Sequence, residues 1–145
     1  MTVDITEIAK RFVGSYTLED VDPNLAELFA PSMTVWHNYD AERMQLPGAT
    51  YVQAMMLKLT ACKKRIPDYT DIIDHLHISD SAITVAATAS GTFPDGTALH
   101  IPRCLVISVE NGLIVSIDSY GDHSQSGPLD RFIPYEELFA STEAS

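Results

Sequence analysis

The sequence predicts a single α+β domain in which helices cover one face of a strongly curved, antiparallel or mixed sheet. Apolar residues recur at helical spacing in the first half of the chain, and after residue 68 they alternate as in strands. Pro94-Asp95-Gly96 and Glu110-Asn111-Gly112 are tight hairpin signals. Helices segregated against a meander of strands make an α+β fold, here a cone lined by the concave face of the sheet. We expect one domain over residues 1–145, with a core of about 5–129 and a tail of 130–145.

Three helices are expected before the meander, in the order helix, helix, strand, helix. The first has an apolar stripe that includes Ile8 and Phe12. Pro23 suits the start of the second helix and Pro31 its end. The third ends before Pro67 and collects cations in its last part, where they suit the helix dipole. The expected helices are residues 6–16, 24–30 and 48–64.

Five strands are expected, one before the third helix and four after it. The clearest is 82–93, in which apolar residues alternate with Thr and Ser. The expected strands are residues 33–38, 69–78, 82–93, 99–109 and 113–122. Residues 39–46 are expected to be irregular, and the tail contains Gly127-Pro128 and a short amphipathic segment at 135–139.

Composition excludes some classes of function. The formal charge is −11, from 20 acids against 9 bases. This balance argues against nucleic acid, whose binders carry basic patches, and against anionic membrane surfaces. No stretch approaches the ~20 apolar residues of a membrane span, and the N-terminus lacks a secretory pattern. Cys62 and Cys104 lack metal-ligand spacing, so we expect reduced thiols in a cytoplasmic protein.

The polar end of the last expected strand suggests a site. Asp118, Tyr120 and Asp122 are two residues apart, so in an extended chain they share a face. Either the strand runs out into solvent there, or it ends in a pocket that needs an acid or a base.

The order of elements resembles the nuclear transport factor 2-like superfamily. Trp36-His37-Asn38 in the first strand and Tyr120-Gly121-Asp122 at the end of the last resemble SnoaL-like and ketosteroid-isomerase-like proteins. The resemblance extends from about Ile5 to Leu129. It implies a cystatin-like or SnoaL-like cone with one apolar pocket, and a homodimer formed through the sheet. The superfold hosts many reactions and also non-enzymes.

Residue-by-residue comparison assigns positions to the expected site. The oxyanion-binding Tyr of ketosteroid isomerases is matched by Phe12, their base Asp by His37, and their oxyanion-side Asp by Arg103. All three functional residues of ketosteroid isomerases are replaced in this chain, so the resemblance does not imply steroid isomerisation itself. Counted from Gly112, Asp122 falls on the acid/base Asp of SnoaL-like polyketide cyclases.

We expect two catalytic residues. Asp122 is the candidate general acid/base, with a pKa raised by desolvation in an apolar pocket. The alternative is a surface carboxylate at the end of a strand. His37 is the second candidate because its ordinary pKa suits proton transfer near neutral pH; the alternative is a hydrogen-bonded core histidine. The two could form a dyad in which Asp122 orients the imidazole.

Other side chains are expected to bind the substrate. Arg103 would bind an anionic or enolate oxygen, or else pair with Asp118 or Asp122. Weaker candidates, as donors, wall or core, are Tyr51, Tyr120, His100, Trp36 and Met55. We expect no cofactor and no metal; His75 and His77 share a strand face but lack a third ligand nearby.

These expectations describe a cofactor-free acid/base enzyme. It would remove a proton from a small hydrophobic oxygenated molecule of polyketide, steroid or aromatic type, leading to isomerisation, cyclisation or elimination. One alternative is a non-catalytic ligand-binding or assembly module of the same fold. Another is a dehydratase or lyase with His37 as sole base.

Overall fold

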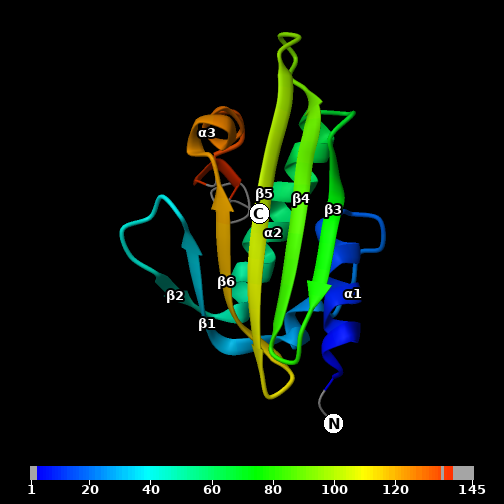
Figure 1. Cartoon of the computed structure of the whole chain (residues 1–145). Helices are drawn as coiled ribbons and strands as arrows, with labels where there is room; N and C mark the ends of the chain where they lie inside the picture. Colours follow the sequence, from blue (N-terminus) through cyan, green and yellow to red (C-terminus); the bar gives the residue numbers. More distant parts are fainter. Residues whose placement is uncertain (1–2, 135, 139–145) are drawn as a thin grey trace.

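The computed structural model describes residues 3–134 and 136–138, and they form helices packed on a curved six-stranded sheet (Figure 1). The helices are α1 (Ile5–Tyr16), the 3₁₀ turn η1 (Leu25–Leu28), α2 (Gly48–Arg65) and α3 (His123–Phe132). The strands are β1 (Phe29–His37), β2 (Met44–Leu46), β3 (Thr70–Ile78), β4 (Ala82–Thr92), β5 (Ala98–Glu110) and β6 (Leu113–Gly121). The predicted α+β class is confirmed. Among these residues, no helix is both long and apolar enough to span a membrane.

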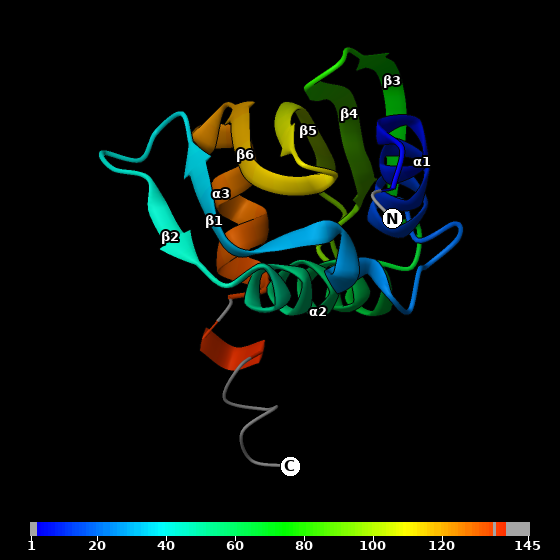
Figure 2. The same ribbon diagram turned by 90° about the horizontal axis from the view of Figure 1, so that it is seen from below.

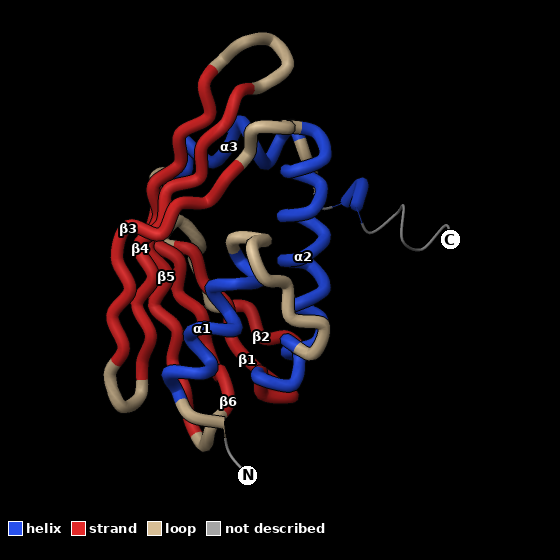
Figure 3. The backbone as a smooth tube through the Cα atoms, turned by 90° about the vertical axis from the view of Figure 1, so that its right-hand side faces the viewer, coloured by secondary structure: helices blue, strands red, loops and turns tan. Residues whose placement is uncertain are grey.

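The sheet is mixed, with the strand order β2-β1-β6-β5-β4-β3. The pairs from β3 to β6 are antiparallel because hairpins join them. β1 pairs in parallel with β6, so the first and last long strands of the chain are neighbours. The sheet curves until α2 lies across its open side, as the view from below shows (Figure 2). Figure 3 shows β3, β4 and β5 on one side of the molecule and α2 on the other.

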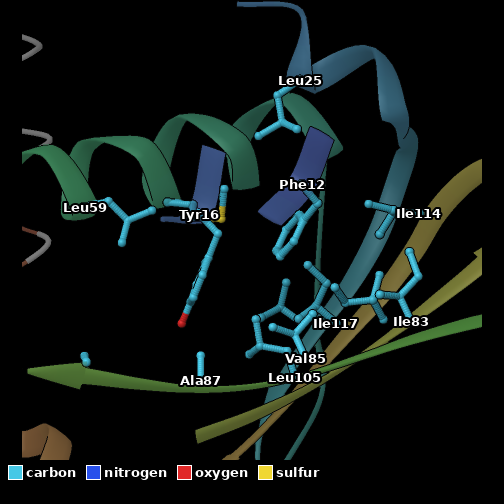
Figure 4. Packing of buried hydrophobic residues seen from close by; sticks show 14 of the residues in the cluster. Phe12, Tyr16, Leu25, Leu59, Ile83, Val85, Ala87, Leu105, Ile114 and Ile117 are labelled. Carbon is cyan, nitrogen blue, oxygen red and sulfur yellow. The ribbon is translucent and has the colours of Figure 1, made fainter. Parts of the chain in front are cut away.

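Local sequence explains where α1 begins and which face it buries. The carboxylate of Asp4 caps the helix by accepting a hydrogen bond from the backbone N–H of Thr6, at 2.7 Å. Ile8, Phe12 and Tyr16 follow at intervals of four residues and are all buried. Phe12 and Tyr16 point toward the concave face of the sheet (Figure 4).

The core lies between the helices and the concave face. On β4 the buried residues Ile83, Val85, Ala87 and Ala89 alternate with half-buried polar or small ones. Figure 4 shows Leu59 of α2 on the opposite side of this core. The small Ala87 and Ala89 matter for the site, because they fill little of the cone.

The second expected helix is shorter than predicted. Only η1 is helical, and β1 already begins at Phe29, so the prediction that Pro31 ends a helix is wrong. The pairing of β1 with β6 is irregular between Phe29 and Thr34. Pro31 lies in that interval, where a residue without a backbone N–H is tolerated.

Two elements were not predicted. β2 lies in the segment 39–46 that was expected to be irregular, and it pairs with β1. α3 occupies part of the expected tail and contains Gly127 and Pro128. In the expected amphipathic segment 135–139, both end residues lie outside the described part of the chain.

Candidate active site

The cone contains a cavity of about 500 Å³. Its walls come from the inner faces of β5 and β6, from α2, from the residue just before β3, and from α3 with the segment after it. The turn after β1 forms part of the rim. Leu59, Ile101 and Leu129 supply apolar wall, and His37, Arg103 and Asp122 are the predicted site residues that line it.

His37 lies at the rim, in a turn with Asp40. One carboxylate oxygen of Asp40 is 3.0 Å from His37 Nδ1 and also accepts the backbone N–H of His37 at 3.0 Å. The imidazole stacks on Tyr39, which in turn packs against His123 of α3. When Nδ1 carries the proton toward Asp40, Nε2 is the nitrogen that can accept another. The geometry therefore orients His37 as a base.

Asp122 lies where the last strand gives way to α3 and caps that helix. Its Oδ1 accepts the backbone N–H of Ser124 at 2.9 Å and the Ser124 hydroxyl at 2.7 Å. The Ser124 hydrogen bonds lower the pKa of this exposed carboxyl. The predicted upward pKa shift is wrong, because the residue begins a helix at the surface and is not a strand end in an apolar pocket. Asp40, and not Asp122, is hydrogen-bonded to His37.

Arg103 lies on β5 and faces the cavity between Ala87 of β4 and Gly121 of β6. The expected pairing of Arg103 with Asp118 is wrong, because Asp118 forms an ion pair with Arg43. Arg103 instead lies close enough to Asp71 and Tyr69 for its charge to act on both.

Sequence analysis missed a buried Tyr69–Asp71 pair. The Tyr69 hydroxyl donates a hydrogen bond to Asp71 Oδ2 at 2.9 Å, and these residues are only 4% and 5% exposed. Desolvation raises the pKa of Asp71, while the charge of Arg103 and the Tyr69 hydrogen bond oppose the shift. A signal was present: Tyr69, Asp71 and Ile73 alternate, which places an acid on an apolar strand face.

The weaker candidates for substrate binding lie elsewhere in the molecule. Trp36 and Tyr120 make an edge-to-face contact at 5.5 Å on the convex face of the sheet, with the Arg43 guanidinium 5.0 Å from the Trp36 ring. His100 is exposed on β5 and does not line the cavity. On α2, Met55 is buried in the core and Tyr51 packs against a neighbouring aromatic ring. None of these five residues lines the cavity.

The described polar residues near the cavity have no metal-site geometry. Within the described ranges, no three His, Cys, Asp or Glu side chains come close enough to hold a metal ion. The rings of His75 and His77 stack at 6.1 Å on exposed β3 residues, as expected for solvated side chains. Burial raises the pKa of the Cys62 thiol to about 11, so at neutral pH this wall residue is a neutral thiol.

Comparison with known protein structures identifies the fold. No protein-family profile and no curated protein sequence matches the chain. An NTF2-like protein of unknown function from Cytophaga hutchinsonii is 16% identical, with a TM-score of 0.60 and coverage of 81% of this chain and 96% of that one. A protein from Jannaschia assigned as a SnoaL-like polyketide cyclase is 10% identical, with a TM-score of 0.58 and coverage of 81% and 86%.

A third similar structure comes from Catenulispora acidiphila. It is a hypothetical protein with a ketosteroid isomerase-like fold, in complex with trimethylamine; it is 19% identical, with a TM-score of 0.56 and coverage of 86% and 95%. The chain has the NTF2-like fold. The predicted resemblance is confirmed at this level. At such identities the NTF2-like fold brings no activity with it, so function has to be argued from the cavity.

Proposed function

We propose that this NTF2-like chain is an acid/base enzyme that needs no cofactor and acts on a small hydrophobic oxygenated molecule. The observation that carries the proposal is that an oriented imidazole and a guanidinium line the same cavity. His37 is oriented by Asp40 at the rim, and Arg103 lies on the inner wall. Ser119 and Gly121 of β6, which pair with His37 and Arg103, also line the cavity.

The residues suit removal of a proton next to a carbonyl or an aryl group. His37 takes the proton, and Arg103 stabilises the negative charge that develops on the substrate oxygen. Return of the proton at another carbon isomerises the substrate, attack of the carbanion closes a ring, and loss of a leaving group completes an elimination. The lowered pKa of Asp122 favours His37 over that carboxyl as the rim base.

Nitrobenzisoxazole tests this proposal because it reports base chemistry directly. Removal of its single ring C–H proton beside nitrogen opens the ring and releases a coloured cyano-nitrophenolate. We expect turnover by the native protein, and a loss on the order of a hundredfold in kcat/KM for His37→Gln, the usual size for a general base. His75→Gln, an exposed histidine on β3, is the matched control and should keep its rate.

The possible results separate the candidate functions. Equal rates for the native protein and His37→Gln would remove His37 from the chemistry. Saturable binding of nitrobenzisoxazole without turnover would favour the alternative of a ligand-binding module and contradict the enzyme.

A further inference from the structure

We infer that Tyr69 and Asp71 form a second proton-transfer pair at the inner wall of the cavity, with Arg103 stabilising the anion that they create. The inference rests on the proposed function and adds a second catalytic group to it. Tyr69 lines the cavity and would touch the ligand, while Asp71 lies behind Tyr69 and receives its hydroxyl proton.

The register of β3, β4 and β5 brings Asp71 and Arg103 to the same part of the sheet. Asp71 of β3 is opposite Ala89 of β4, and Ala89 is opposite Ile101 of β5. Arg103, two residues after Ile101, is opposite Ala87. Side chains two apart share a face, so the small Ala87 and Ala89 lie on β4 between Asp71 of β3 and Arg103 of β5. A longer side chain at either alanine would fill this space.

The environment of Asp71 makes its ionised form costly. Tyr69 donates to Oδ2, but the buried Oδ1 has no hydrogen-bond partner within the described ranges. An ionised carboxylate with an unsatisfied buried oxygen is destabilised, and protonation relieves the cost. The charge of Arg103 offsets part of this cost, so Asp71 can still ionise and then act as a base in a dry site.

The proton moves in one coupled step. A C–H or O–H bond of the ligand breaks and its proton goes to Tyr69 Oη, while the Tyr69 O–H bond breaks and its proton goes to Asp71 Oδ2. Tyr69 ends neutral, Asp71 ends as a carboxylic acid, and the negative charge has moved from Asp71 to the ligand. Arg103 is a counter-charge at the start and an oxyanion partner at the end, so it does not have to move. The reverse step returns the proton.

The second pair gives the cavity two proton-handling groups on opposite sides. β1, which carries His37, and β3 are four strand steps apart in the sheet order. Measured along the sheet this is roughly 19 Å, so His37 and Tyr69 line different parts of the cavity. His37 is half exposed at the rim, whereas Tyr69 is buried. One proton-handling group at the rim and a second at the inner wall suit a substrate that loses a proton at one end and regains one at the other.

The test adds Tyr69→Phe or Asp71→Asn to His37→Gln and measures turnover of nitrobenzisoxazole over a range of pH. Tyr69→Phe keeps the ring and removes only the hydroxyl; Asp71→Asn keeps the shape and removes the base. In the His37→Gln background, where the inner pair is the remaining base, we expect kcat/KM to fall further by about a hundredfold in each. The double variant should be no slower than either single one, because the two residues act as a unit. Asp74→Asn, an exposed acid on the same strand, is the matched control.

The pH profile distinguishes catalysis from a structural role. In a His37→Gln background, the remaining activity should rise with pH as Asp71 ionises, above the ordinary pH range of an aspartate. That rise should be absent once Tyr69→Phe or Asp71→Asn is added. A purely structural pair would lower the thermal midpoint and leave the profile unchanged, which would overturn the inference.

Failure of the inference differs from failure of the proposed function. An inactive native protein contradicts the proposed function. An active native protein in which Tyr69→Phe has no effect on the activity that remains in His37→Gln contradicts the relay alone. If Asp71→Asn does not fold, Tyr69→Phe still decides, because the phenyl ring occupies the same space.

Discussion

At the scale of single residues, the environment of a carboxyl decides its role more than its position in a motif. Asp122 matches a family acid/base position, yet it caps a helix and its pKa is lowered. Asp71 matches no motif that the sequence analysis considered, yet it is buried beside Arg103 and its pKa is raised. Sequence alone could place both residues near strand ends. It could not predict which carboxyl would be desolvated, because this depends on the packing of other segments.

The helix cap leads to a prediction for Asp122. Asn caps helices about as well as Asp, so Asp122→Asn should keep both α3 and most of the turnover of nitrobenzisoxazole. Asp122→Ala removes the cap and should lower the thermal midpoint by a few degrees. Its effect should shrink in acid, because a carboxyl with a lowered folded pKa stabilises above its unfolded pKa and loses this contribution as pH falls through the folded value. A large loss of turnover in Asp122→Asn would restore the acid/base role predicted from the sequence.

Asp71 should show the opposite dependence of stability on pH. Its folded pKa is raised, so between the ordinary aspartate value and that raised pKa the folded state binds more protons than the unfolded state. The contribution of Asp71 to the free energy of unfolding should therefore increase as pH falls through this interval. Urea unfolding of the native protein and Asp71→Asn at several pH values measures the difference. A difference that does not vary with pH would contradict the raised pKa.

At the scale of elements, the sequence predicts the helices and strands whose hydrophobic pattern is regular. It does not predict those whose pattern is interrupted. The four strands of the meander and two α-helices were predicted within a few residues, because alternation and helical spacing persist along them. α3 was missed because Gly127 and Pro128 lie inside it and hide its pattern. The alternation of Asp118, Tyr120 and Asp122 leaves open whether their face meets solvent or a pocket. In the structure Asp118 pairs with Arg43 and Tyr120 packs on Trp36.

α3 closes part of the cavity, and a buried lysine is one of the side chains that link it to α2. The buried Lys58 donates to the backbone carbonyl of Ile133 and lies 3.3 Å from an oxygen of Asp130. Lys58→Met should lower stability by about 1–3 kcal/mol, since it leaves these acceptors without their donor. Hydrogen exchange should speed up in α3 and not in β4. Lys64→Met, an exposed lysine on the same helix, is the control, and equal exchange in the two variants would show that Lys58 does not hold α3.

At the scale of the whole molecule, charge is unevenly distributed around the sheet. The chain carries a formal charge of −11, but the outward residues of β4 from Ala82 to Ser90 are uncharged. They are opposite an outward row on β5 that runs from His100 to Ser108 and contains no acid. Ile72 on β3 and Tyr120 on β6 lie beside these rows and are 53% and 44% exposed. Charged groups flank these rows, since Asp74 of β3 accepts a hydrogen bond from Thr88, and Asp118 of β6 is opposite Val106 and pairs with Arg43. A face with an uncharged, partly apolar centre on an acidic protein is typical of a surface that meets another copy.

We propose that two copies associate through this outer face. Each copy is strongly acidic, so the two repel at long range, and added salt should strengthen association by screening that repulsion. Sedimentation equilibrium should therefore give twice the 15.9 kDa chain mass at moderate salt, with weaker association at low salt. Ala86→Glu places an unpaired charge in the centre of the face and should give monomers, whereas Lys64→Glu on α2 makes the charge more negative away from it. If both variants dissociate equally, net charge and not the outer face controls assembly, and a native protein that is monomeric at every salt concentration contradicts the dimer.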